Sequence, residues 1–372
     1  MAQELIMKIT SFRKIILSLS AVVFVSSAVF SQEAEEGKNQ KKNADIWKFY
    51  EQTAAAYYFK SDYVSGGDHF APITGLFNSF ELKTTFNAEC KIPAPLGKHF
   101  LLKDSNIRIK TAFELCPVTV RPLVSVSFTP LPFFVFSTGA SIGTGWSALG
   151  FKGLCKLDED AFYSNKLKHF LNDLFSNPIA FLPRYKKEYK DFIEYENLTP
   201  FGNYYYDFWF SGLFQFDTGA IFQGNWTHAV MQASYTVSYV GVTGVDDGKI
   251  WLWQLVGNNC NGWRYTANFV LGYQMPLPLS MIAVNTDVYA LFNSDDYGIY
   301  SSSYNGDFTN VTISPMLKFD FSKKDSLFVL FEFKKRRSFE EEHSESKEEI
   351  FLTYSGAEWF FNRIAFSWTH VF

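Results

Sequence analysis

Apolar and polar residues alternate along much of this chain, and the alternation is clearest at its C-terminal end. In an extended conformation, one face of the last ten residues would carry Ile364, Phe366, Trp368, His370 and Phe372. The opposite face would carry Arg363, Ala365, Ser367, Thr369 and Val371. A period of two places successive side chains on opposite faces of a strand. We therefore predict a C-terminal β-strand with one bulky face that continues to the last residue.

Segments of the same kind recur between turn residues through most of the sequence. We count about 14 of them, within a range of about 12 to 16. Clear examples are 80–90, 106–115, 204–217, 264–275, 282–292 and 311–321. A strand tilted across a bilayer needs about 9–11 residues, whereas most soluble strands have about five or six. The pattern therefore favours a transmembrane antiparallel β-barrel over residues 48–372.

A soluble β-sandwich or lipocalin-like barrel is the alternative, with the apolar faces packed inward. Two observations count against it. Phe and Tyr gather near the ends of the apolar faces, as in the aromatic girdles of membrane barrels. So many long apolar faces would also give more core surface than two packed sheets need. Phe, Tyr and Trp make up 19% of the chain, which fits exposure of aromatic side chains to lipid.

The alternation stops between residues 154 and 202, where apolar residues return at helical spacing and Pro178 follows them. Such spacing is typical of an amphipathic helix, and a proline commonly follows a helix end. The residues with this spacing are Tyr163, Leu167, Phe170, Leu171 and Leu174. We predict a helix within an insertion at 154–202. The insertion could fill the lumen as a plug, cover one mouth or lie on the membrane interface, and the sequence leaves these roles open.

The first residues have the layout of an export signal. Basic residues precede the apolar stretch 15–30, and the small residue Ser31 stands at a suitable cleavage point. We predict a signal peptide over residues 1–31, followed by a charged, flexible tether over 32–47. A buried or membrane-spanning helix is the alternative, but the apolar stretch is short for a membrane span.

Net charge and cysteine spacing exclude some other functions. The formal net charge is −4, whereas nucleic-acid partners are usually met by a basic patch or a high pI. We therefore expect no nucleic-acid partner. The four cysteines are widely spaced, fit no metal-binding pattern, and could be free or paired in an exported protein; they are Cys90, Cys116, Cys155 and Cys260. We expect no cofactor and no metal.

The polar faces of the predicted strands carry charges of both signs. On the inner wall of a barrel such charges must be hydrated or paired. They could form ion pairs that stiffen the wall, or they could line a water-filled pore and act on passing solutes. Barrels much larger than eight strands leave an interior that side chains alone do not fill. The residues predicted to line the pore are Arg108, Lys110, Glu114, Asp207, Arg264, Asn268, Asn285, Asp287, Lys318, Asp320, Glu332 and Arg363.

The export signal, the alternating strands and the terminal aromatic together resemble bacterial outer-membrane β-barrel proteins. In that family the barrel-assembly machinery recognises a C-terminal aromatic residue preceded by bulky residues at alternate positions. The matching residues here are Ile364, Phe366, Trp368 and Phe372. His370 departs from the pattern, because the family usually has an apolar residue there. Residues 128–146 are also similar to segments of barrel proteins from spirochaetes.

The resemblance implies an outer-membrane location, with the lipid bilayer and the barrel-assembly machinery as partners. It also raises a question about loop lengths, because such barrels usually have short periplasmic turns. If the last strand ends in the periplasm, a strand break near Phe360 would place the charged stretch 336–349 on the periplasmic side. Either the break is misplaced or this barrel has long periplasmic loops, so the sequence leaves the sidedness of the loops open.

Candidate chemistry in the predicted loops is weak. Asp68 and His69 are adjacent, and Asp295 and Asp296 could approach a divalent ion, but neither pair has the surrounding spacing of a known site. Structural or solvated roles suit these residues better than catalysis. The sequence therefore favours a diffusion channel for small solutes. A surface or structural protein with a plugged lumen, such as an adhesin, and a membrane-embedded hydrolase remain alternatives.

Overall fold

The structure is a computed structural model. It describes residues 46–372 except 63, 65, 100, 149, 159–194, 223, 255, 294–295, 297–307 and 344–349. Strand residues 258, 339–343 and 350–354 are described by their backbone alone. The predicted signal peptide and almost all of the predicted tether therefore lie outside the described residues, as do the helix predicted within 154–202 and the pair partner Asp295.

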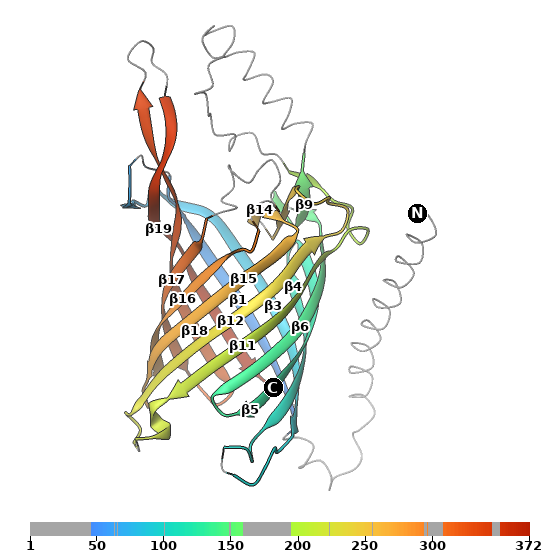
Figure 1. The fold of residues 1–372 in the computed structure, drawn as a ribbon, viewed down its shortest axis with the longest axis vertical. Coiled ribbons are helices and arrows are strands. Elements are labelled where there is room, and N and C mark those ends of the chain that lie inside the picture. The colour runs from blue at the N-terminus through green and yellow to red at the C-terminus, as the bar shows by residue number, and fades with distance from the viewer. Residues whose placement is uncertain are drawn as a thin grey trace. The chain divides into compact units, whose positions relative to one another are not determined.

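The chain forms a closed antiparallel barrel of 12 strands within a sheet of 13 (Figure 1). The predicted fold class is confirmed, and the strand number lies within the predicted range. In order around the barrel, the strands are β1 (Trp47–Lys60), β3 (Gly75–Pro93), β4 (Asn106–Cys116), β5 (Thr119–Leu131), β6 (Phe134–Gly145), β11 (Tyr205–Asp217), β12 (His228–Val242), β15 (Gly262–Gln274), β16 (Leu279–Leu291), β17 (Asn310–Asp320), β18 (Asp325–His343) and β19 (Ile350–Val371).

The barrel closes where its first and last strands meet. β1 pairs with β19 in an antiparallel register that runs from Tyr50↔Val371 to Tyr58↔Arg363. The backbone N–H of Phe372 donates to the carbonyl of Phe49 at 3.0 Å, a normal length for a backbone hydrogen bond. Closure leaves the C-terminal strand hydrogen-bonded on both edges, so a chain that ends on an aromatic residue exposes no open sheet edge there.

β19 is one continuous strand of 22 residues, so the predicted break near Phe360 is wrong. The register of β18 against β19 shifts between Glu332 and Phe333, because Asn362 is an extra residue in β19. A bulge of this kind changes the phase of the alternation without ending the strand. Residues Glu358 to Phe360 of β19 also pair in parallel with the short strand β2 (His69–Ala71).

With β19 intact, the two ends of the barrel have different connections. The end that holds Phe372 carries the connections 94–105, 132–133, 218–227, 275–278 and 321–324. One of these contains the 3₁₀ turn η2 (Thr218–Ala220). The opposite end carries 61–74, 117–118, 146–204, 243–261, 292–309 and 344–349, which include all of the longest connections. We call it the long-loop end.

A second, small sheet forms from two of the long connections. Its order is β10 (Tyr195–Asn197), β9 (Leu154–Leu157), β13 (Ile250–Trp253) and β14 (Val256–Cys260). We call it the inner sheet. The predicted insertion therefore contributes strands, β9 and β10, as well as residues outside the described part. The short hairpin β7 (Ser147–Ala148) and β8 (Phe151–Lys152) precedes it.

The inner sheet packs against the barrel through a cluster of buried apolar residues. Trp253 stacks on the Tyr205 ring at 4.6 Å between centroids, and Trp251 meets the same ring edge-on at 6.0 Å. Gly143 of β6 makes room for Trp253, since a Cβ there would lie 2.6 Å from the indole. The cluster comprises Leu154, Leu198, Tyr205, Val240, Val242, Val245, Trp251 and Trp253.

The four cysteines are free thiols, which answers the question that their spacing left open. Cys155 and Cys260 are buried in the inner sheet, and burial fits their use as small apolar residues. Among the described residues, no helix has the length and hydropathy needed to cross a membrane.

Candidate channel lining

The two faces of the barrel wall differ sharply in chemistry. On β15, Phe269 and Leu271 expose 52% and 66% of their surface, whereas the neighbouring Asn268 is partly buried and hydrogen-bonded. Other exposed apolar residues on the same face of the wall are Phe80, Leu82, Phe86, Phe113, Phe136, Phe208, Phe210, Met231, Ile282, Val284, Phe366 and Trp368. A continuous exposed apolar surface of this extent is typical of contact with a membrane.

Cross-strand register places all twelve residues predicted to line the pore on the opposite face. Asn268 lies opposite Asp287, and Glu332 lies opposite Arg363, so the assignment carries from one strand to the next. The full set is Arg108, Lys110, Glu114, Asp207, Arg264, Asn268, Asn285, Asp287, Lys318, Asp320, Glu332 and Arg363.

Side chains that reach over a whole strand identify this face as the concave one. The guanidinium of Arg121 on β5 lies 5.9 Å from the ring centroid of Tyr205 on β11, with β6 between them. The ammonium of Lys110 on β4 lies 5.5 Å from the ring of Tyr50 on β1, with β3 between them. Side chains converge in this way only on the inside of a curved sheet.

An ion-paired cluster bridges the seam where the barrel closes. The Nη2 of Arg363 lies 2.8 Å from Oε2 of Glu332 on β18, and its Nη1 lies 3.1 Å from Oε2 of Glu81 on β3. The same Nη1 donates to the hydroxyl of Tyr58 on β1 at 2.7 Å. Lys83 pairs with the other oxygen of Glu81 at 3.2 Å. We call these five residues the seam cluster; they join β18, β19, β1 and β3.

A second cluster fastens the inner sheet to the wall. Glu114 pairs with Arg121 at 2.9 Å. The amide of Gln254, just after β13, donates to Oε1 of Glu114 at 2.9 Å and to the hydroxyl of Thr119 at 2.8 Å. Gln254 has a positive φ of 49°, a conformation that non-glycine residues adopt infrequently. No local pattern predicts the role of Gln254, because it follows an apolar run and lies far from Glu114 in the chain.

The remaining predicted residues have partners on the same strand, on the neighbouring strand or a few residues away in sequence. Asp287 accepts from the amides of Asn268 and Asn285, both at 2.7 Å. Lys318 pairs with Asp320 at 3.0 Å. The other contacts are Arg108 with Glu89 at 3.6 Å, Asp207 with Ser141 and with the Tyr205 hydroxyl at 3.1 Å, and Arg264 with the Cys260 carbonyl at 3.0 Å.

These contacts show that ion pairs are frequent on the inner face of the wall. Most of the predicted charges have an oppositely charged neighbour, as the stiffening interpretation requires. Asp287 and Asp207 differ, because the hydrogen-bond partners described for them are neutral amides and hydroxyls.

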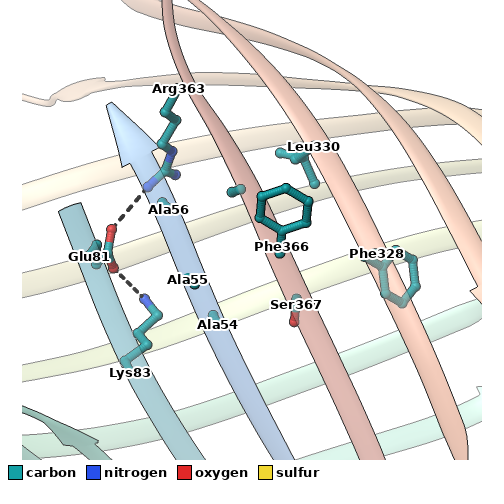
Figure 2. Close-up of a pocket in the computed structure, with 11 residues that line it drawn as sticks. Ala54, Ala55, Ala56, Glu81, Lys83, Phe328, Leu330, Arg363, Phe366 and Ser367 are labelled. Atoms are coloured by element: carbon teal, nitrogen blue, oxygen red, sulfur yellow. Dashed lines mark hydrogen bonds and ion pairs between the residues drawn. The ribbon is translucent and has the colours of Figure 1, made fainter. Parts of the chain in front are cut away.

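A recess in the inner wall lies beside the seam cluster (Figure 2). Its volume is about 190 Å³. Small residues form its floor, Glu81 and Lys83 stand on one side, and Phe328 and Leu330 stand on the other. The floor residues are Ala54, Ala56, Ala365 and Ser367.

At the long-loop end of the seam, a buried carboxylate holds the loop 61–74 against the barrel. Glu358 of β19 is fully buried and pairs with Arg336 and with Nε2 of His69, the latter at 2.7 Å. The Nδ1 of His69 lies 2.7 Å from the carbonyl of Gly67. That hydrogen bond and the nearby carboxylate raise the pKa of His69. His69 therefore has a structural role; its partner lies 289 residues away in sequence, so adjacency could not reveal it.

The predicted assembly residues lie on the outer face of β19. Phe366 and Trp368 are 44% and 41% exposed, and Phe372 is 65% exposed at the end of the strand. Ile364 shares their face by alternation. His370 lies on the same face and pairs with Asp325 at 2.8 Å, which gives a local reason for its departure from the usual apolar residue.

Comparison with known proteins gives matches in structure only. No protein-family model matches the chain, and the curated proteins searched by sequence include no match. The fold is similar to that of the KdgM porin, with 7% identity, coverage of 88% of this chain and 99% of that chain, and a TM-score of 0.30. It is also similar to an outer-membrane channel of Pseudomonas putida F1, with 8% identity, coverage of 88% of this chain and 96% of that chain, and a TM-score of 0.37. For the outer-membrane channel DcaP of Acinetobacter baumannii, the identity is 9%, the coverage is 88% of this chain and 96% of that chain, and the TM-score is 0.31.

Proposed function

We propose that this chain is an outer-membrane channel for the diffusion of small solutes. The observation that carries the proposal is the separation of the two wall faces, with aromatic and aliphatic side chains outside and the twelve predicted polar and charged residues inside. A wall of this kind suits lipid on one side and water on the other. The barrel strands, of 11 to 22 residues, are long enough to span a bilayer.

The unequal connections support one orientation in the membrane. Short turns usually face the periplasm and long loops the exterior. The end that holds Phe372 would then face the periplasm, and the long-loop end with the inner sheet would face outside. In this orientation the charged stretch 336–349 would lie toward the outer side, since β19 is one unbroken strand.

Export and assembly belong to the same proposal. Residues 1–31 would be removed after Ser31, and intact-mass measurement of protein from the native membrane tests this cleavage. The barrel-assembly machinery would then recognise the outer face of β19. Retention of residues 1–31 in the mature protein would contradict the export part.

Single-channel recording of the refolded protein in a planar bilayer tests conduction. The wild type should give discrete conductance steps. Replacing Asp287 and Asp320 by Asn should shift the reversal potential toward anion preference, because the inner wall loses negative charge. A matched double variant on the outer face, Thr53→Ser with Thr286→Ser, should leave the reversal potential unchanged. A folded wild type that is silent at all voltages would contradict the proposal.

The inner sheet favours an occluded barrel with a surface function as the second candidate. It packs on the inner face of β11 and β12 at the long-loop end and is fastened to Glu114 on β4, so it would narrow the lumen there. If the wild type is silent, replacing residues 159–194 by a short linker and changing Gln254 to Ala should release the inner sheet. Conductance that appears only in this variant would indicate a gated or occluded pore, whereas continued silence would favour a filled interior.

A further inference from the structure

The recess beside the seam cluster exists because four inward positions on two neighbouring strands carry small side chains. Ala54 lies opposite Ser367, and Ala56 lies opposite Ala365, so two successive cross-strand pairs are small. Elsewhere along these strands the inward positions carry larger groups, such as Tyr58 and Arg363 in the next pair. The result is a hollow of about 190 Å³ in the wall.

The two sides of the recess have opposite chemistry. On the β18 side, Phe328 lies opposite Ser367 and Leu330 lies opposite Ala365, so both apolar side chains border the floor. On the β3 side, Glu81 and Lys83 border it (Figure 2). With its alanine floor, the recess offers an apolar surface facing a charged edge. An apolar group of a solute gains free energy by covering such a surface.

The contacts that the charged edge already makes limit what it can still bind. Glu81 is occupied: Oε1 pairs with Lys83, and Oε2 accepts from Tyr58 at 2.8 Å and from Arg363. Arg363 is nearly occupied, since it donates to Glu332, Glu81 and Tyr58.

Lys83 differs from both neighbours. Its ammonium has three N–H donors; it pairs with Glu81 at 3.2 Å and also attracts the Glu114 carboxylate through space, without a described hydrogen bond between them. Its side chain is 34% exposed. The edge therefore has donors to spare and few acceptors, so it suits a ligand head group that accepts hydrogen bonds and carries negative charge.

We propose that the recess is a binding subsite for small carboxylates with an apolar body, of which benzoate is a simple example. The apolar body lies on the alanine floor against Phe328 and Leu330, and the carboxylate accepts from Lys83. The inference rests on the proposed channel function, because a solute reaches the recess through the lumen. Weak binding at such a site is compatible with passage, since a solute must also leave.

The test compares three probes on the full-length, refolded channel in a planar bilayer. Benzoate has both the apolar body and the charge, acetate lacks the body, and benzyl alcohol lacks the charge. Benzoate should interrupt the current at concentrations at least about tenfold below those of the other two. Ala365→Leu fills the recess and should abolish this difference. Lys83→Gln should weaken the benzoate block while leaving the weak effect of benzyl alcohol unchanged.

Ser234→Leu is the matched control, because it adds a similar volume to the inner face on β12, away from the recess. It should retain the benzoate block. Equal block by benzoate and acetate in a conducting wild type, or full benzoate block in Ala365→Leu, would overturn the subsite and leave the channel function standing.

A silent wild type would instead overturn the channel function. Saturation-transfer NMR with benzoate on the refolded barrel then decides the subsite by itself. Contact of benzoate with the wild type and its loss in Ala365→Leu would support the subsite, and equal signals from the two proteins would refute it.

Discussion

Replacing Arg363 by Met should weaken the barrel at its seam. The substitution keeps a long side chain but removes the guanidinium that contacts Glu332 at 2.8 Å, Glu81 at 3.1 Å and Tyr58 at 2.7 Å. Two inward carboxylates then lose their shared cation. Because the contacts join β18, β19, β1 and β3, the loss falls on the four strands around the closing pair.

The size of the effect follows from how buried the cluster is. Breaking a buried ion pair by removing one partner costs about 3–5 kcal/mol. Here the value should be lower, because the side chain of Arg363 is 27% exposed and both carboxylates keep another partner, Lys83 for Glu81 and Asn362 for Glu332. We expect Arg363→Met to lower the free energy of unfolding by about 2–3 kcal/mol.

Urea unfolding of the barrel in lipid vesicles, followed by tryptophan fluorescence, measures this change. Adding Glu332→Gln to Arg363→Met should restore about 1 kcal/mol, because one uncompensated carboxylate is removed. Lys318→Met is the control: its pair with Asp320 has a similar length of 3.0 Å but is more exposed, so its loss should cost only about 0–1 kcal/mol. Equal losses for Arg363→Met and Lys318→Met would refute the structural role of the seam cluster.

Leu271→Arg on the outer face should lower the free energy of unfolding by about 2–4 kcal/mol near the bilayer midplane, whereas Asn268→Arg on the inner face should be tolerated. Brominated lipids should quench a fluorophore at position 271 and not at 268; equal quenching would contradict the register. Deleting Phe372 should reduce surface levels in cells much more than refolding in detergent, as surface labelling and gel mobility can show. The pKa of His69 is raised by a carbonyl in its own loop and by the carboxylate it contacts, so its stabilising charge is present at low pH and lost as pH rises through that pKa. Hydrogen-exchange protection of the loop 61–74 should therefore be higher at about pH 6 than at about pH 9; equal protection would contradict the role of the charge.

Alternation alone was enough to predict the faces of the wall. In β15, Arg264 and Asn268 lie on the inner face and Phe269 and Leu271 on the outer one, as the period of two requires. The prediction succeeds because a membrane barrel separates water from lipid at every spanning strand, so each strand carries the signal by itself.

The same reasoning failed at residues 359–362 for an identifiable cause. Asn362 is bulged, so the alternation changes phase between Phe361 and Arg363 while the hydrogen-bonded ladder continues. In a sequence, a change of phase looks the same as the end of one strand and the start of the next. Only the pairing with β18 distinguishes them, and that pairing is not encoded in the local pattern.

The inner sheet was beyond sequence analysis for a different reason. Its strands have three to five residues, too few for a period to be measured. Their stability comes from partners distant in sequence, such as Trp253 on Tyr205 and Gln254 on Glu114. Such contacts depend on where two long connections meet, which neither connection specifies alone.

The positions of the inner sheet and the recess in the strand order bear on how a solute would pass. The inner sheet packs on β11 and β12, the sixth and seventh strands around the barrel, and is also held to β4, β5 and β6, the third to fifth. The recess lies on β1 and β19, the first and last. In a closed ring of 12 strands, β11 and β12 lie across the lumen from β1 and β19. In the proposed channel, the inner sheet would narrow the lumen on the side of β4 to β12, and a solute would pass nearer the seam. A channel with this arrangement would bring each solute past Lys83 and the alanine floor, so selectivity and barrel closure would depend on the same few residues.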